Sequence, residues 1–374
     1  MHAELAATDA AHAADSGAQP RTGALVRVEA PARLHLGFLD PSATLGRRFG
    51  SLGLVVEGLE TVVEAAPADG DRFDAGPGAA EELGRVRAHV QALRRATGCH
   101  AGLHLTLARA IPTHAGLGSG TQLALAVGHA FSAAFGLGLD SARISTLLGR
   151  GARSGVGIAG FDAGGLLLDG GPRADGSPAA LIARLALPPA WRVILVLDPR
   201  VRGLSGDQEK SALQTLPPLR REVAADLCHE VLMRLLPGAA GAEFAPFAAG
   251  VTRVQRLLAQ HFAPAQGGAY ASAAVGRVVE WIAAHACAGT GQSSWGPTGF
   301  AIVSSLDEAR RALASAQAAG VVDPALELRI TSARNRGGTI GVSGSGRMRS
   351  DPGMPAEPRE CKGQVAYDLA PKTI

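Results

Sequence analysis

Apolar and polar residues alternate along several short stretches of the chain, and this period of two is typical of half-buried strands. Elsewhere apolar residues recur every three or four positions, which predicts helices. The expected strands cover residues 24–29, 54–64, 103–107, 166–168, 191–198, 301–304 and 326–330. The expected helices cover residues 81–97, 123–135, 140–150, 222–236, 247–260, 271–286 and 306–319. This succession, without internal repeats, predicts an α+β protein with two lobes.

The pattern restarts at Pro188 and Pro189, where a new apolar run begins. Such a restart after a proline pair is typical of a domain boundary. We therefore predict a first domain over residues 24–189 and a second over residues 190–343. The segment 1–23 is rich in alanine, and the segment 344–374 is polar and broken by prolines. We expect a disordered extension and a flexible tail there.

Three glycines alternate at Gly116, Gly118 and Gly120, directly before the helix expected over residues 123–135. Glycine permits positive φ and a close approach of the backbone to a ligand. A loop that leads into a helix N-terminus also offers unpaired N–H groups and the positive end of the helix dipole. We therefore predict a phosphate site, with a plain loop as the alternative, and a helix cap supplied by Ser119 or Thr121.

Three other motifs do not fit. No Lys-Ser or Lys-Thr pair follows the glycines, so the loop is not a Walker A sequence. Gly155, Gly157 and Gly160 match Gly-x-Gly-x-x-Gly, but we expect neither a preceding strand nor a helix that opens there, which argues against dinucleotide binding. The sequence His-Glu-Val-Leu-Met at 229–233 lacks the second histidine of a zinc protease.

Arg33 and His35 occupy alternate positions of an apolar segment that follows Pro31. Residues two apart on a strand point to the same face, so both side chains share one side. That side either meets a ligand or forms the solvated face of an edge strand with a structural ion pair. The pattern leaves both interpretations open.

Composition and charge exclude several classes of protein. The chain of 374 residues is 47% hydrophobic with a formal net charge of +3, which gives no reason to expect a nucleic-acid partner. No uninterrupted apolar run suits a membrane span, and the four cysteines form no Cys-x-x-Cys pair, which favours a reducing, cytoplasmic location. Lys210 is the only lysine before the tail and lies among polar residues, so lysine-bound pyridoxal phosphate is not expected.

Four segments carry a more specific pattern: Arg-Leu-His-Leu-Gly-Phe-Leu-Asp at 33–40, Gly-Leu-Gly-Ser-Gly-Thr-Gln at 116–122, Ser-Gly-Val-Gly-Ile-Ala-Gly-Phe at 154–161 and Gly-Gln-Ser-Ser-Trp-Gly-Pro-Thr at 291–298. Their order and the Gly-Leu-Gly-Ser loop resemble the GHMP kinase superfamily. Kinases of that superfamily usually carry Gly-Glu where this chain has Gly37-Phe38, and a second serine where it has Gly120. These departures resemble the β-ribofuranosylaminobenzene 5′-phosphate synthase branch of the superfamily.

The resemblance covers about residues 25–341, most of the chain, and implies a two-lobed GHMP-type fold. Its first lobe is like the second domain of ribosomal protein S5, its second lobe is ferredoxin-like, and ligands lie between them. The implied reaction joins 4-aminobenzoate to phosphoribosyl pyrophosphate and releases pyrophosphate and carbon dioxide, early in tetrahydromethanopterin biosynthesis. It needs no ATP, and Mg²⁺ is the expected companion of the pyrophosphate. An ATP-dependent small-molecule kinase and a non-catalytic phosphate-binding regulator are the alternatives.

The same resemblance suggests roles for particular residues. The candidate catalytic residues are Arg33, His35 and Asp162; the last stands where kinases place a base, although the implied reaction has no hydroxyl to deprotonate. The candidate phosphate- and substrate-binding residues are His114, Gly116, Leu117, Gly118, Ser119, Gly120, Thr121, Gln122, Ser154, Gln292, Ser293, Ser294 and Trp295. Trp295 either stacks on the aromatic acid or fills the core. The sequence identifies no metal ligand. The expected partners are small-molecule substrates, and the sequence is compatible with a homodimer.

Overall fold

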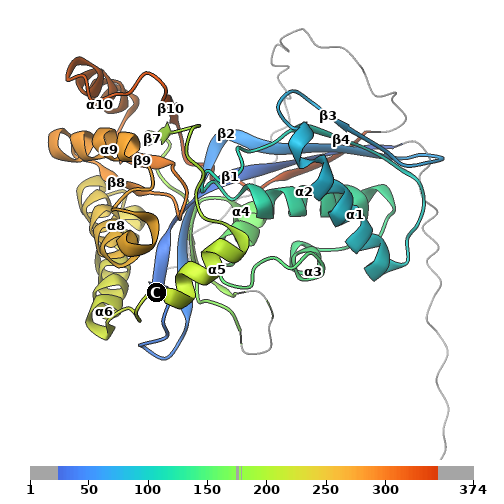
Figure 1. The fold of residues 1–374 in the computed structure, drawn as a ribbon, viewed down its shortest axis with the longest axis horizontal. Coiled ribbons are helices and arrows are strands. Elements are labelled where there is room, and N and C mark those ends of the chain that lie inside the picture. The colour runs from blue at the N-terminus through green and yellow to red at the C-terminus, as the bar shows by residue number, and fades with distance from the viewer. Residues whose placement is uncertain (1–23, 174–176, 178, 344–374) are drawn as a thin grey trace, which may run out of the picture.

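The computed structural model describes residues 24–343 except 174–176 and 178, so the predicted extension and tail lie outside the described residues. Two lobes lie side by side along the longest axis (Figure 1). The strands of the first lobe are β1 (Leu25–Asp40), β2 (Phe49–Pro67), β3 (Arg72–Ala75), β4 (Leu103–Arg109), β5 (Leu166–Asp169), β6 (Leu181–Leu185) and β11 (Thr339–Ser343). Its helices are a short 3₁₀ turn (Ala80–Glu82), α1 (Leu83–Thr97), α2 (Ser119–Ala134), α3 (Ser141–Leu147) and α4 (Val156–Ala163).

The second lobe begins at β7, and α5 (Gly206–Thr215) follows that strand. Its strands are β7 (Arg192–Leu197), β8 (Gly289–Gln292), β9 (Gly299–Val303) and β10 (Glu327–Thr331). Its remaining helices are α6 (Arg221–Glu230), a π-helical turn (Val231–Leu235), α7 (Leu236–Ala240), α8 (Phe244–Gln266), α9 (Ala273–His285) and α10 (Leu306–Ala318). The two-lobed α+β architecture expected from the sequence is confirmed.

Each lobe has its own sheet. In the first sheet the strands run in the order β11-β1-β2-β4-β3, with β5 paired to β2 and β6 paired to β5. All of these pairs are antiparallel except β3 with β4. The second sheet is antiparallel in the order β10-β7-β9-β8. Strand β7 of this sheet is buried on both faces, which explains the continuous apolar run at 191–198.

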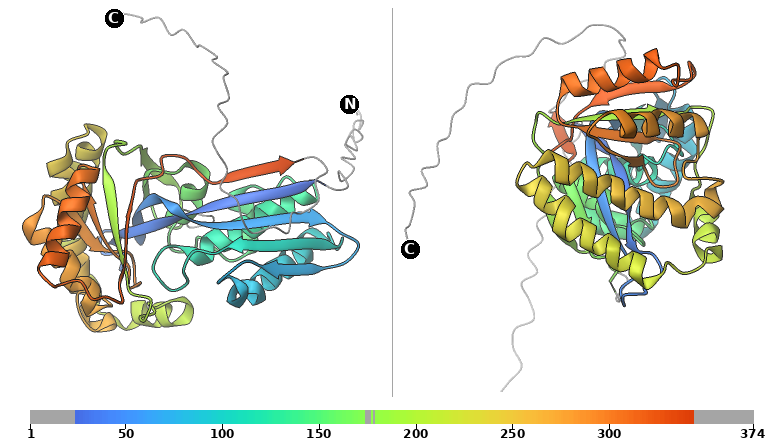
Figure 2. Two further views of the ribbon diagram at one scale, coloured as in Figure 1. Left: turned by 90° about the horizontal axis from the view of Figure 1, so that it is seen from above. Right: turned by 90° about the vertical axis from the view of Figure 1, so that its left-hand side faces the viewer.

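The chain returns to the first lobe at its end. Strand β11 pairs with β1 from Leu25 opposite Ser343 to Glu29 opposite Thr339, and Figure 2 shows the two strands side by side. The segment predicted as the second domain, 190–343, therefore contributes its last strand to the first sheet. This strand was not expected, since it is only five residues long and all five are exposed.

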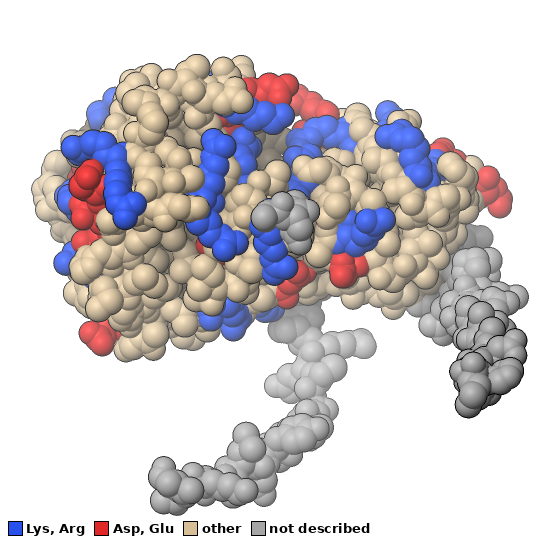
Figure 3. Space-filling view, turned by 90° about the horizontal axis from the view of Figure 1, so that it is seen from below, with Lys and Arg blue, Asp and Glu red and all other residues tan. Residues whose placement is uncertain are grey.

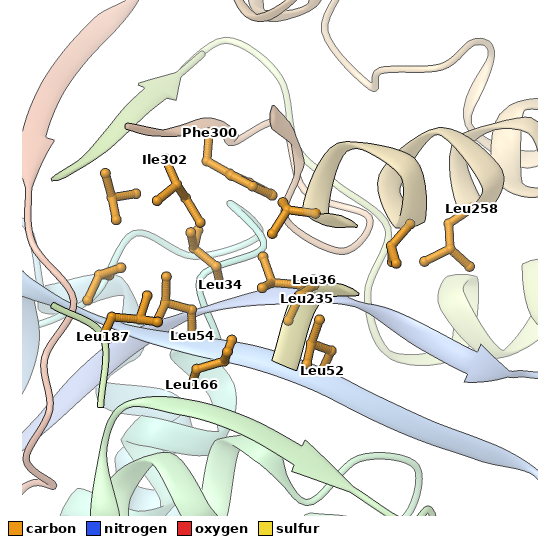
Figure 4. Packing of buried hydrophobic residues seen from close by; sticks show 14 of the residues in the cluster. Leu34, Leu36, Leu52, Leu54, Leu166, Leu187, Leu235, Leu258, Phe300 and Ile302 are labelled. Carbon is orange, nitrogen blue, oxygen red and sulfur yellow. The ribbon is translucent and has the colours of Figure 1, made fainter. Parts of the chain in front are cut away.

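A continuous apolar core joins the lobes. Strand β1 contributes Leu34 and Leu36, α8 contributes Leu258, and β9 contributes Phe300 and Ile302 to one buried cluster (Figure 4). Strands β1 and β2 are long enough to reach from the first sheet to the second lobe (Figure 2). Since apolar side chains pack across the junction, the two walls of the space between the lobes are held relative to each other.

Several boundaries differ from the prediction, and α4 is the most informative case. We expected no helix at the glycines 155–160, yet Gly155 precedes the first residue of α4, and Gly157 and Gly160 lie within it. A Cβ on Gly160 would stand 2.9 Å from Val55, so close packing of α4 on β2 explains a glycine where helix propensity disfavours one. No strand precedes this segment, so the dinucleotide fingerprint is still incomplete.

Candidate functional site

The glycine loop has the backbone geometry that its sequence predicts. Gly116 has φ of 82° and Gly118 has φ of 81°, both in the left-handed region. Gly118 is the residue before the first turn of α2, and no side chain caps that helix. The predicted cap from Ser119 or Thr121 is wrong, because the left-handed turn at Gly118 places both residues already inside the helix. The first turn of α2 thus keeps N–H groups that no side chain occupies.

Hydrogen bonds tie the loop to the two segments that the motifs predicted beside it. The Ser293 hydroxyl accepts from the His35 N–H at 2.9 Å and donates to the Gly116 carbonyl at 2.7 Å. The Arg33 Nη1 donates to the same carbonyl at 2.9 Å, and the Arg33 N–H donates to the Leu117 carbonyl at 3.1 Å. One buried serine therefore fixes the relative positions of three distant segments.

Strand β1 is irregular where it meets this junction. Its pairing with β2 shifts between Pro31 and Arg33 and again between His35 and Gly37. Such irregularities change the direction of a strand locally and re-aim its side chains. Both Arg33 and His35 line the space between the lobes, so the shared face inferred from their alternation is a face of the site and not an open edge.

A cleft of about 810 Å³ lies beside the glycine loop. Its walls come from β1, the loop, α1, the segment 149–157, α5 and the turn 294–296. Figure 3 shows arginine and lysine side chains gathered along the middle of one face, where the two lobes meet. The predicted residues that line the cleft are Arg33, His35, His114, Gly116, Gly118, Ser119, Gly120, Thr121, Ser154, Ser294 and Trp295.

The structure does not bring the other predicted residues to the cleft. Asp162 accepts a hydrogen bond from Ser141, which also contacts His129 at 2.8 Å, so α4 turns this carboxylate toward α3. Gln122 is buried and donates to the Gly157 carbonyl at 2.8 Å, which ties α2 to α4. Leu117 fills the core. Ser293 does not line the cleft, but its hydroxyl bonds to His35 and Gly116, which do. Gln292 lines a second cavity.

That second cavity, of about 340 Å³, adjoins the cleft and is mostly apolar. It lies between α8, β8 and the start of α9, with Leu258 and Phe262 in its wall. Trp295 packs edge to face on Phe262, with ring centroids 4.7 Å apart. The two cavities share His35, Phe38, Ser294 and Trp295. The two cavities are therefore neighbours, and we call these four shared residues the junction wall.

Burial sets the charge of Arg33, in the cleft, and of His35, in the junction wall. Burial lowers the pKa of Arg33 to about 10, although Glu209 opposes the shift. Arg33 still carries its charge at neutral pH, and its Nε has no hydrogen-bond partner among the described residues. Burial, with the charges of Arg33 and Arg153, lowers the pKa of His35 well below its usual value. His35 is therefore neutral at pH 7. No residue that the structure describes bonds to its buried Nε2, which leaves this atom available to a ligand.

Five further cations of the cleft were not predicted as site residues: Arg48, Arg85, Arg150, Arg153 and Lys210. Of the carboxylates in the described part of the chain, two line the same space, Glu82 and Glu209. Each is paired, Glu82 with Arg85 at 2.8 Å and Glu209 with Arg153 at 2.6 Å. The cleft is therefore strongly cationic, as a site for a polyanion requires. Arg150 and Arg153 are close in sequence to the predicted Ser154. This closeness is the feature of the sequence that could have indicated these two arginines as site residues.

The donors in the cleft do not form a metal site by themselves. Among the described residues, no group of three histidine, cysteine or acidic side chains is placed to hold an ion. The two carboxylates of the cleft are engaged by arginines, as described above. Magnesium is usually bound through one or two carboxylates together with substrate phosphates. An ion here would depend on oxygens that the substrate brings.

Comparison with known proteins identifies the class. The GHMP kinases N terminal domain matches residues 85–165, from α1 to the end of the turn after α4. The chain superposes on a homoserine kinase from Cytophaga hutchinsonii with a TM-score of 0.60 at 18% identity, over 84% of this chain and 97% of the other. The fold and the glycine loop are thus those of a GHMP-type protein.

The sequence comparison narrows this class. A beta-ribofuranosylphenol 5′-phosphate synthase from Archaeoglobus fulgidus is 34% identical over 245 residues, 62% of this chain and 76% of that protein. Its namesake from Methanothermobacter thermautotrophicus is 29% identical over 334 residues, 83% and 97% of the two chains. The chain belongs to the beta-ribofuranosylphenol 5′-phosphate synthase family of GHMP-type proteins. The resemblance inferred from the motifs is confirmed, with a phenol in the relatives' name where the motifs implied an aminobenzene.

Proposed function

We propose that this protein transfers a phosphoribosyl group from phosphoribosyl pyrophosphate to the ring of a para-substituted benzoate, with loss of pyrophosphate and carbon dioxide. The acceptor carries an amino or a hydroxyl group opposite its carboxylate. This assigns the enzyme to an early step of tetrahydromethanopterin biosynthesis, in the cytoplasm. Among the described residues, no helix is both long and apolar enough to cross a membrane.

One observation carries the proposal: a cationic cleft at a glycine loop and a mostly apolar cavity lie side by side and share four lining residues. Phosphoribosyl pyrophosphate is a polyanion and suits the cleft, because arginines and free N–H groups bind phosphate oxygens. A benzoate ring is apolar and suits the cavity lined by Phe262, Leu258 and Trp295. The two reacting carbons then meet at the junction wall.

The chemistry balances without a protein acid or base. The para substituent donates electrons into the ring, so the ring carbon that bears the carboxylate attacks the anomeric carbon. A carbon–carbon bond forms, and the bond from the anomeric carbon to the pyrophosphate oxygen breaks with its electron pair on the leaving group. The carbon–carboxylate bond then breaks, and its electrons restore the aromatic ring as carbon dioxide leaves. A neutral His35 and a distant Asp162 are consistent with this scheme.

The residues of the site therefore act by position and charge. Arg33 and the N–H groups at the start of α2 stabilise the negative charge that develops on the departing pyrophosphate. The junction wall holds the ring carbon against the anomeric carbon, which removes the entropy cost of their encounter. We propose that Mg²⁺ arrives bound to the pyrophosphate oxygens, and no step above depends on it.

The test is a direct assay of the purified protein. It is mixed with phosphoribosyl pyrophosphate, Mg²⁺ and carboxyl-labelled 4-aminobenzoate or 4-hydroxybenzoate, with no ATP. The proposal predicts labelled carbon dioxide and pyrophosphate in equal amounts with one or both acids, and none without the ribosyl donor. Failure to release carbon dioxide from either acid, or a strict need for ATP with accumulation of ADP, overturns it.

A further inference from the structure

Two arginines from separate elements converge on the start of α2. Arg85 lies on α1, and Arg150 follows α3. A Cβ placed on Gly120 would stand 2.9 Å from Nη2 of Arg85 and 3.5 Å from Nη1 of Arg150. Both guanidinium tips therefore rest on the same glycine in the first turn of α2. Both residues also line the cleft.

The charge of the pair is only partly compensated, because one carboxylate faces two guanidinium groups. Arg85 bonds to Glu82 through Nη1, which leaves the Nη2 that faces Gly120 without an acidic partner. Arg150 has no ion pair with any described residue, and its buried Nε has no hydrogen-bond partner. Two like charges that are held together and partly desolvated raise the free energy of the empty site. An anion between them removes that cost.

The glycine at position 120 also indicates that the start of α2 is shaped to accommodate Arg85 and Arg150. It lies inside α2 in a helical conformation, where alanine is favoured over glycine. Its φ is not positive, so conformation does not explain the glycine. Any side chain there would meet the tip of Arg85. The missing side chain thus leaves room for the arginine pair at the helix N-terminus.

The three loop glycines arrange the cleft in order. Gly116 packs on the turn at 293–296, next to the apolar cavity, and Gly118 packs on Arg33. Gly120 packs on the arginine pair, which does not line the apolar cavity. A ribosyl donor whose anomeric carbon faces the acceptor must hold its pyrophosphate near Arg33 and extend its 5′ end away from the junction wall. The arginine pair lies at that far end of the loop.

We propose that Arg85 and Arg150 form a subsite for the 5′-phosphomonoester of the ribosyl donor, an assignment that rests on the proposed function. The subsite fixes the direction of the substrate in the cleft. It also distinguishes a donor with phosphates at both ends from free pyrophosphate, which reaches only the part of the loop near Arg33.

The test separates the two ends by using each one alone. Calorimetry measures the binding of ribose 5-phosphate and of inorganic pyrophosphate to the full-length protein. Arg150→Ala and Gly120→Ala are the test variants. Arg33→Ala tests the pyrophosphate end of the donor. Arg95→Ala is the matched control, because Arg95 is an exposed arginine on the same helix as Arg85. Melting temperatures establish that each variant is folded.

We expect Arg150→Ala to weaken ribose 5-phosphate binding at least tenfold, because it removes a charge-assisted contact, and to weaken pyrophosphate binding less than threefold. Arg33→Ala gives the reverse pattern, and Arg95→Ala changes neither. Gly120→Ala follows Arg150→Ala in binding while its melting temperature holds or rises.

Two results overturn the subsite. Either ribose 5-phosphate binds the Arg150→Ala variant as tightly as the wild type, or it binds neither protein. A loss of pyrophosphate binding alone in Arg150→Ala overturns the direction. A wild type that binds ribose 5-phosphate through the pair but releases no carbon dioxide from either aryl acid overturns the proposed function instead, because the binding series needs no turnover.

Discussion

Replacing Ser293 by alanine tests whether the three motifs act as one unit. The Ser293 hydroxyl is fully buried and makes two hydrogen bonds, to the His35 N–H and the Gly116 carbonyl. Without it the His35 N–H is buried and unpaired, which costs about 1–3 kcal/mol. The Gly116 carbonyl still accepts from Arg33, so its loss is smaller. We expect Ser293→Ala to lower the free energy of unfolding by about 2 kcal/mol.

Urea denaturation measures this change, and the melting temperature should fall by roughly 4 °C. Ser294→Ala is the matched control. The Ser294 hydroxyl makes no hydrogen bond within the described part of the chain, and the Ser294 N–H donates to the His35 carbonyl in both variants. We expect its stability to stay within about 0.5 kcal/mol of the wild type. Equal stability of Ser293→Ala and wild type, or equal losses in the two variants, would show that Ser293 does not hold the segments together.

Three further predictions concern the loop, the arginine and a buried histidine. Gly118→Val should abolish binding of phosphoribosyl pyrophosphate in calorimetry while circular dichroism shows a folded protein, because valine resists the φ of 81° and its Cβ would stand 3.2 Å from the Arg33 guanidinium carbon; normal binding would remove the loop from the site. Arg33→Lys should lose nearly as much kcat/KM as Arg33→Ala, about 2–4 kcal/mol, because an ammonium cannot reproduce bidentate contacts; a lysine variant with wild-type activity refutes this. Burial, with the charges of Arg150 and Arg85, lowers the pKa of His89 to about 4, so the unfolded chain binds the proton more tightly and stability should fall as pH drops from about 6.5 toward 4. Urea midpoints of wild type and His89→Gln across that range check it, and parallel pH curves would contradict it.

Much of the fold could be predicted where the apolar pattern is strong. The helix at 306–319 appears as α10, and the strand at 191–198 appears as β7, because each buries a regular stripe or run. Asp140 caps α3, since its side chain accepts from the Arg143 N–H at 2.7 Å. Helix α5 was missed because it is polar and has no buried residue. The apolar periodicity of the sequence reflects burial, so elements that bury few side chains show no clear periodicity.

The glycine loop could be predicted because its chemistry resides in the backbone. Glycines in that spacing before a helix permit positive φ, and the helix N-terminus exposes N–H groups. Arg85 and Arg150 could not be predicted, because an arginine that lines a cleft and an arginine in solvent have the same local sequence. Only folding brings α1 and the segment after α3 together at Gly120. The role suggested for Asp162 depended on position in a motif, and the contact of α4 with α3 turns its carboxylate away.

The most direct test of the central claim is the bond that the enzyme forms. The acceptor acid is labelled with ¹³C at the ring carbon that bears the carboxylate, the ribosyl donor is labelled with ¹³C at its anomeric carbon, and the product is examined by NMR. The account predicts a one-bond ¹³C–¹³C coupling in a product that has lost its carboxylate. A product that retains the carboxylate, with the anomeric carbon bonded to the amino nitrogen or the phenol oxygen, would contradict it.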